Sequence, residues 1–233
     1  GILKTKADLR IFPSDELINF RNLYSTNHRV IYNPTLPSIT NTNLRKKLNI
    51  ENKFVCGRIA RADIEIYSNY NLLAYKNIED ENTVFLYVNP SNKAIEDSKL
   101  LGIKNIIFLN PTFNDFELSE IYNTFDVLCH SNNLGETFGN TIAEAMIHGI
   151  PVISHKGSDH YPQAQRELLK DFLEYYIETD IVNNYTKKIL CLKNDETLRL
   201  NISNKMKDYA LRNFEYSKIC KIYINTLKEY FFI

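Results

Sequence analysis

The sequence predicts an α/β protein with a doubly wound parallel sheet and extra helices at its C-terminal end. Two observations lead to this fold class. From Lys53 onward, continuous apolar runs alternate with segments of helical length, which is typical of parallel strands buried on both faces. In the last third of the chain, apolar residues recur at three- and four-residue steps, which indicates helices.

The composition is that of a globular protein without a strong overall charge. The chain has 233 residues, 44% of them hydrophobic, and its 28 basic and 28 acidic residues give a formal net charge of +0. No global field would therefore recruit nucleic acid or an anionic membrane. The four cysteines lack disulfide or metal-ligand spacing, and no apolar run approaches the ~20 residues of a membrane span. We expect a cytoplasmic protein; whether it also lies on a membrane surface stays open.

The N-terminal part is expected to hold two short strands and one helix. An apolar run covers 7–13, Ser14 is placed to cap a helix over 15–24, and a second strand-like run covers 29–32. Prolines at positions 34 and 37 then impose an extended connector, and a polar segment follows over 38–52.

The pattern becomes regular after this connector. Strands are predicted at 54–56, 84–88, 106–109, 127–129 and 152–153. Helices are predicted between them at 70–78, 94–101, 116–123 and 141–148, and beyond them at 163–177, 181–192, 196–213 and 216–231. Ligands bind at the carboxyl ends of such strands, where the segments 110–115 and 129–141 fall.

The segment 129–156 contains the strongest functional pattern. Gly135 and Gly139 allow the backbone to approach a ligand closely, and the free N–H groups of the helical turn that starts at Gly139 suit a phosphate. Glu136 and Glu144, eight positions apart, are poor phosphate ligands but good acceptors for sugar hydroxyls. Phosphate and hydroxyl recognition together indicate a nucleotide sugar.

This segment resembles a known signature. Gly-Glu-Thr-Phe-Gly followed by Glu-Ala-Met-x-x-Gly-x-Pro-Val-Ile is similar to the Glu-x7-Glu motif of retaining glycosyltransferases with the GT-B fold, family 4 above all, whose two lobes are Rossmann-like. The resemblance implies that Glu136 faces the donor sugar and Glu144 holds the ribose. It also implies donor contacts, largely from backbone amides near the distal phosphate, at Thr137, Phe138, Gly139, Asn140 and Thr141.

A second motif follows the strand predicted at 54–56. A guanidinium at Arg58 could form two hydrogen bonds to a phosphate, and Gly57 would admit the ligand. The motif resembles the Gly-Arg loop of the same family, in which an arginine and a later lysine clamp the diphosphate. That lysine is absent here, where Glu65 and Ile66 stand instead. Arg61 either takes its role or pairs with Asp63 on the surface.

Further candidates lie at other strand ends. The resemblance places Asn110 and Pro111 in the nucleobase loop. Ser131 or Asn132 could reach donor hydroxyls, and His130 is either a packed strand-end histidine or a catalyst. Residues 155, 156 and 159 lie near the expected mouth of the site. No acidic triad or histidine cluster has metal-ligand spacing, so no metal is expected.

The resemblance also divides the chain. Residues 1–37 would be a remnant of the first lobe plus the hinge, 38–215 the Rossmann-like nucleotide-sugar-binding domain, and 216–233 the closing helix, whose aromatic stripe is a core face or a docking or membrane-edge surface. The implied activity is transfer of a sugar from a UDP-, GDP- or ADP-sugar to an unknown acceptor, with retention of the anomeric configuration and without a metal. The first lobe would belong to a longer chain or to a separate polypeptide. A non-catalytic nucleotide-sugar-binding module and a nucleotide-sugar epimerase are the alternatives.

Overall fold

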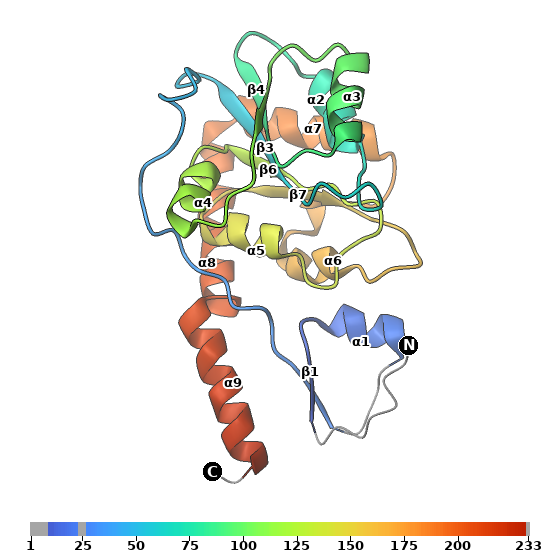
Figure 1. The fold of residues 1–233 in the computed structure, drawn as a ribbon, viewed down its shortest axis with the longest axis vertical. Helices are drawn as coiled ribbons and strands as arrows, with labels where there is room; N and C mark the ends of the chain where they lie inside the picture. Colours follow the sequence, from blue (N-terminus) through green and yellow to red (C-terminus); the bar gives the residue numbers. More distant parts are fainter. Residues whose placement is uncertain (1–8, 23–26, 232–233) are drawn as a thin grey trace.

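The centre of the molecule is a parallel sheet of six strands in the order β5-β4-β3-β6-β7-β8 (Figure 1). The computed structural model describes residues 9–22 and 27–231. The strands are β3 (Phe54–Ile59), β4 (Thr83–Val88), β5 (Ile106–Leu109), β6 (Val127–Cys129), β7 (Val152–His155) and β8 (Tyr176–Ile177). The continuous apolar runs therefore form buried parallel strands, as predicted.

Helices cover both faces of this sheet. In Figure 1, α2 (Tyr70–Lys76), α3 (Asn92–Leu100) and α7 (Ile181–Asn194) gather on one side, and α4 (Asp115–Tyr122), α5 (Asn140–Ile147) and α6 (Ala164–Leu168) on the other. Two long helices, α8 (Glu196–Asn213) and α9 (Tyr216–Phe231), complete the chain, and α8 packs on α5. The core runs through the strands, with Val55, Phe85 and Leu128 fully buried. This arrangement is the predicted doubly wound fold.

The order of the strands changes direction between β3 and β6. The chain moves outward from β3 through β4 to β5, then returns to place β6 on the other side of β3. Two helix layers diverge at such a switch point, and a crevice opens there at the carboxyl ends of the strands. The end of β3 and the residues after β6 are therefore the positions in this fold best placed to hold a ligand.

The N-terminal segment forms a small unit of its own. Strands β1 (Arg10–Phe12) and β2 (His28–Val30) pair in parallel in a separate two-stranded sheet, and helix α1 (Asp15–Arg21) lies between them in sequence. Ser14 caps α1 by accepting the N–H of Leu17, as predicted. The beginning of the apolar run at 7–13 and the end of the helix expected over 15–24 lie outside the described residues.

The proline-containing connector is tied to the junction between α8 and α9. Thr35 pairs with Glu215 in an isolated bridge, because its N–H donates to Phe214 at 2.8 Å and its carbonyl accepts from Tyr216 at 3.0 Å. Helix α9 continues from this junction beside the N-terminal sheet, where Asn27 donates to Tyr230 at 3.2 Å. Within the described residues, no helix combines the length and the hydropathy that a membrane crossing requires.

One predicted helix is wrong. The segment 163–177 forms the short helix α6, a 3-10 turn η1 (Lys170–Tyr175) and the edge strand β8. Phe172 breaks the helical path with φ −139°, and Tyr176 and Ile177 pair with Ser154 and His155 of β7. The buried apolar residues of this segment recur at helix-like spacing, which predicts a helix. The backbone instead follows the pairing of Tyr176 and Ile177 with β7, which the spacing does not reveal.

Candidate functional site

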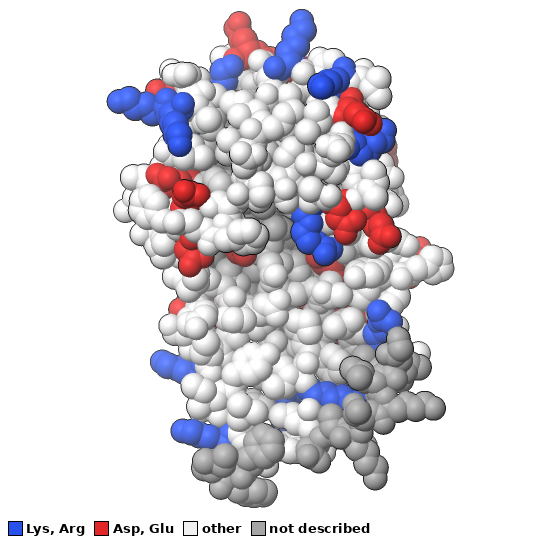
Figure 2. All heavy atoms as spheres, in the orientation of Figure 1, with Lys and Arg blue, Asp and Glu red and all other residues white. Residues whose placement is uncertain are grey.

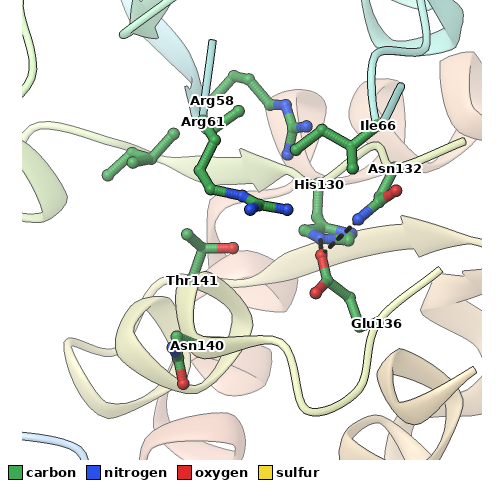
Figure 3. A pocket seen from close by; sticks show the side chains of 10 residues that line it. Arg58, Arg61, Ile66, His130, Asn132, Glu136, Asn140 and Thr141 are labelled. Carbon is green, nitrogen blue, oxygen red and sulfur yellow. Dashed lines mark hydrogen bonds and ion pairs between the residues drawn. The ribbon is translucent and has the colours of Figure 1, made fainter. Parts of the chain in front are cut away.

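A cavity of about 180 Å³ opens at the switch point between β3 and β6 (Figure 3). Three parts of the chain that are distant in sequence form its walls: the end of β3, the loop after β6 and the first turn of α5. They bring together seven residues that the sequence singles out as candidates, and Ile66 also lines the cavity. The seven are Arg58, Arg61, His130, Asn132, Glu136, Asn140 and Thr141. The two sequence motifs therefore meet in one place.

Arg58 is a buried cation with an incomplete set of partners. Its side chain is 4% exposed, one terminal nitrogen donates to the carbonyl of Ser131, and its Nε has no hydrogen-bond acceptor among the described residues. A buried donor without an acceptor costs about 1–3 kcal/mol, and more when the group is charged. Because Arg58 also lines the cavity, its buried positive charge would favour an anionic ligand there.

The first turn of α5 faces the same cavity. Gly139 precedes the helix with φ 100°, a left-handed conformation that favours glycine, and the eight-residue helix follows directly. The backbone N–H groups of Asn140 and Thr141 have no acceptor among the described residues. Free amides at the positive end of a helix dipole bind anions. The cavity thus has a guanidinium on one wall and a helix N-terminus on another.

Glu136 is held firmly on one side only. Its Oε1 accepts from His130 Nε2 at 3.0 Å and from Asn132 Nδ2 at 2.9 Å, and its backbone N–H donates to Gln165 at 3.0 Å. Burial alone would raise the pKa of Glu136, but the hydrogen bonds from His130 and Asn132 and the charge of Arg58 outweigh it and lower the pKa. Glu136 therefore presents a carboxylate to the cavity.

Glu144 lies one helical turn further along α5 and does not line this cavity. Its Oε2 accepts from the hydroxyl of Tyr122 at 2.6 Å, and it borders a neighbouring cavity of about 140 Å³ shared with Asp115, His148 and the connector at 34–37. Burial raises the pKa of Glu144, which the hydrogen bond from Tyr122 only partly offsets. The two glutamates of the motif thus sit in opposite electrostatic settings.

Arg61 extends into the cavity from the chain just after β3 (Figure 3). Its side chain is 77% exposed, and it approaches Asp63 only at 4.0 Å. An exposed pair at this distance contributes little to stability. The structure thus contains the weak pair with Asp63 that one interpretation expects and also places Arg61 on the cavity wall. That Arg61 takes the role of the absent lysine stays a prediction. Ile66, at one of the two positions that replace the lysine of the resembled motif, lines the cavity as an apolar residue.

Comparisons with known proteins identify the family and the fold of this chain. The model of the family Glycosyl transferases group 1 matches residues 40–210, most of the chain. The chain belongs to this family. A search of curated proteins found no match.

Solved structures of glycosyltransferases share the fold. HepE of Anabaena in complex with UDP-glucose has a TM-score of 0.79 at 20% identity over 96% of this chain and 64% of HepE. A glycosyltransferase of Rickettsia africae gives a TM-score of 0.79 at 14% identity, again over 96% of this chain and 64% of that one. The C-terminal domain of the group 1 protein LpcC of Francisella tularensis gives 0.63 at 19%, covering 77% of this chain and 95% of that domain.

These matches confirm the predicted family and the Rossmann-like GT-B lobe. The chain spans about 64% of the length of the first two proteins and nearly all of the LpcC domain. Within the described residues of this group 1 chain, no group of three or more His, Cys, Asp or Glu side chains is arranged to hold a metal ion.

Several predicted contacts do not reach the cavity through their side chains. Ser131 is fully buried, and its hydroxyl lies 2.8 Å from His155 Nε2. Phe138 is 2% exposed and packs on Tyr32 and Phe214, with 5.8 Å between ring centroids in each pair. For both residues, only backbone groups could contact a donor sugar nucleotide, because the side chains are buried in the core.

Three further predicted residues lie elsewhere. Asn110 and Pro111 are exposed after β5, the edge strand of the sheet, and do not line the cavity. The carbonyl of Thr137 accepts from Ser14 at 2.6 Å, so it joins the glutamate loop to the N-terminal segment. Whether these residues contact a nucleotide stays a prediction.

The structure gives Gly57 a packing role. Gly57 lies inside β3, and a Cβ atom there would fall 2.2 Å from the ring of Phe125, so the missing side chain makes room for an aromatic ring of the core. That Gly57 also admits a ligand stays a prediction.

Sequence reasoning missed the residues that support Glu136. Gln165 is fully buried on α6, accepts the N–H of Glu136 and donates to the carbonyl of His155 at 3.3 Å. Ser154 holds the ring of His130 at 2.8 Å. The segment that contains Gln165 was predicted as a regular helix with no link to the site, and no local pattern marks a contact across 29 residues.

Proposed function

We propose that this chain is the donor-binding lobe of a glycosyltransferase that uses a UDP-sugar. The observation that carries the proposal is the buried Arg58, whose Nε lacks an acceptor and which lines the same cavity as the free amides of α5. A diphosphate between them would compensate the guanidinium charge and accept hydrogen bonds from the amides. The UDP-glucose complex of HepE, which shares the fold, supports uracil as the base and a hexose as the sugar.

The residues then take distinct roles. Arg58, Arg61 and the α5 N-terminus stabilise the negative charge that grows on the nucleoside diphosphate as it leaves. Glu136 accepts a hydroxyl of the sugar, and Glu144 accepts the ribose hydroxyls with the oxygen that Tyr122 does not engage. The bond between the anomeric carbon and the diphosphate oxygen breaks, and the acceptor oxygen bonds to that carbon on the same face, so the configuration is retained. The departing diphosphate takes up the proton of the acceptor hydroxyl. The positive charge that stabilises the leaving diphosphate comes from the two arginines and the α5 helix dipole, so the proposal requires no metal.

The rest of the machinery belongs to a first lobe. We propose that residues 1–37 pack with that lobe and contain the hinge, that 38–215 form the donor domain, and that 216–233 close the structure. The separate β1–β2 sheet and the bridge between Thr35 and Glu215 support this division. The acceptor site would lie on the first lobe, in the same chain or a separate one.

A second candidate is a lobe that binds a nucleotide sugar without transferring it. The observation in its favour is Ile66, which places an apolar side chain in the cavity at one of the positions expected for a phosphate-binding lysine. Sugar transfer by the chain together with a supplied first lobe would exclude this candidate.

Isothermal titration of the full chain with UDP, GDP and ADP tests the proposed function. We expect UDP to bind most tightly, and Glu144→Ala to weaken it by about 1–3 kcal/mol, because ribose hydroxyls lose their acceptor. Glu96→Ala, which removes an exposed carboxylate on α3, should leave the affinity unchanged. Thermal melting of each variant reports whether it is folded. Absence of nucleotide binding at millimolar concentration, or equal affinity of folded Glu144→Ala, would contradict the proposal.

A further inference from the structure

We propose that His130 is a positioning residue that fixes one oxygen of Glu136 and leaves the other for the donor sugar. This inference rests on the proposed function and deepens it, because it concerns how the sugar is held. It also decides between the two interpretations of His130, as a packed strand-end histidine or a catalyst.

The hydrogen bonds of Glu136 divide its carboxylate into two unequal halves. His130 and Asn132 both donate to Oε1, whereas Oε2 has no partner among the described residues. In Figure 3 the carboxylate projects into the cavity with only Oε1 joined to these two side chains. A carboxylate oxygen with free lone pairs can accept hydroxyl groups. The sugar therefore meets Oε2, at a position set by the two donors on Oε1.

The protons on the His130 ring follow from its partners. Glu136 is an acceptor only, so Nε2 carries the proton of the bond to Oε1. Burial lowers the pKa of His130 more than the bond to Glu136 raises it, so the ring is neutral and Nδ1 accepts from the Ser154 hydroxyl at 2.8 Å. The basic nitrogen of the ring thus faces a fully buried serine on β7 and not the cavity. In this state His130 cannot act as a general base on a substrate.

The backbone around His130 is equally constrained. The N–H of His130 donates to the carbonyl of Ile153 at 2.9 Å, and the carbonyl of His130 accepts from the Tyr185 hydroxyl at 2.8 Å. Gln165 holds the backbone of Glu136 from the opposite side. A carboxylate gripped at one oxygen and at its backbone can present the other oxygen without rearranging, which is what preorganised binding requires.

A second serine–histidine pair joins the same two parts of the chain, the residues just after β6 and the end of β7, and provides a matched control. Ser131 lies 2.8 Å from His155 Nε2, while Nδ1 of His155 lies 2.7 Å from the carbonyl of Lys156. This pair is as deeply buried as Ser154–His130, but no hydrogen bond joins it to the Glu136 carboxylate. Changes at His155 therefore report the cost of disturbing the strand ends without touching Glu136.

The decisive measurement compares UDP with UDP-sugars in titrations of the full chain. UDP-glucose, UDP-galactose and UDP-N-acetylglucosamine are tested, and the sugar contribution is the ratio of the best of these affinities to that of UDP. We expect His130→Phe to reduce this ratio about tenfold or more, the value of a lost hydrogen bond to a charged group, and to change UDP affinity less than twofold. His130→Gln, which keeps an N–H donor, should restore part of the ratio, whereas His155→Gln should leave it unchanged.

The outcomes separate the inference from the proposed function. An unchanged ratio in folded His130→Phe, or no sugar contribution in the wild type although UDP binds, would overturn the positioning role. Equal losses for UDP and UDP-sugar would show a structural role only. Failure of UDP to bind would contradict the proposed function, and the role of His130 would then be decided by the titration of Glu136 itself.

That titration is followed by the carbon NMR signal of the Glu136 carboxyl. Besides His130, Arg58 on β3 acts on this carboxyl, Arg61 lines the same cavity, and α6 presents the uncharged Gln165. Removal of a donor from a carboxylate raises its pKa, so His130→Phe should move the midpoint to higher pH. The same midpoint in wild type and variant would overturn the inference without any ligand.

Discussion

At the scale of single residues, the two glutamates of the motif perform different electrostatic tasks. Glu136 is surrounded by donors that hold its pKa below the ordinary value, whereas burial raises the pKa of Glu144. Their spacing in the sequence predicts that both belong to one site, because a short loop and the first turns of a helix connect them. It cannot predict their environments, which depend on Asn132 nearby and on Tyr122 and Arg58 from distant elements.

This contrast predicts opposite effects of pH on stability. A lowered pKa in the folded state stabilises the fold above the ordinary value of 4.5, and this contribution is lost as pH falls through the lower folded pKa. A raised pKa costs stability as pH rises above 4.5. Relative to wild type, we therefore expect Glu136→Gln to be less stable at pH 7 than at pH 4, and Glu144→Gln to be relatively more stable at pH 7. Urea unfolding at both pH values measures the two differences, and differences of the same sign would contradict this account.

At the scale of elements, strands and helices can be predicted where the apolar pattern alone determines them: continuous apolar runs for buried strands, and three- and four-residue steps for helices. The strands β3 to β7 appear as continuous apolar runs, and α8 and α9 have the predicted bounds. The segment 163–177 fails because its apolar residues serve an edge strand as well as a helix. Strand β3 is longer than the predicted run at 54–56, since pairing with β4 continues through Ile59 and places Gly57 and Arg58 on the strand itself.

The position of Gly57 on β3 gives a second test. Gly57→Ala brings a methyl group into the ring of Phe125, and overpacking of this kind costs about 1–3 kcal/mol of unfolding free energy. Adding Phe125→Leu should restore part of the loss. Thermal or urea unfolding measures both variants. If Gly57→Ala kept full stability but lost UDP binding, the ligand-admitting role predicted from the sequence would be correct and the packing role wrong.

At the scale of the whole molecule, α6 connects the N-terminal segment with the candidate site. Gln165 holds the backbone of Glu136, and two positions later Glu167 accepts from the Tyr32 hydroxyl at 2.9 Å and from the N–H of Glu16 at 3.0 Å. Asn33 also donates to Asn140 in the cavity wall at 2.9 Å. The position of the N-terminal segment and the geometry of the cavity are therefore linked through hydrogen bonds that no local sequence pattern announces.

The molecular surface carries charges of both signs. On the face shown in Figure 2, acidic and basic side chains alternate around the upper part instead of forming one large patch of a single sign. Recognition of an anionic ligand then depends on the local cations and helix terminus of the cavity, because the formal net charge is +0.

Hydrogen exchange of the full chain with and without UDP tests the central claim most directly, because it locates the nucleotide on the sequence. The account predicts protection of the amides of Asn140 and Thr141 and of the residues that follow β3, since these line the cavity with Arg58. The exposed stretch of α9 should not change. Protection confined instead to the larger cavity of about 470 Å³ beside Lys156 and Ile181 would contradict the assignment of the donor site.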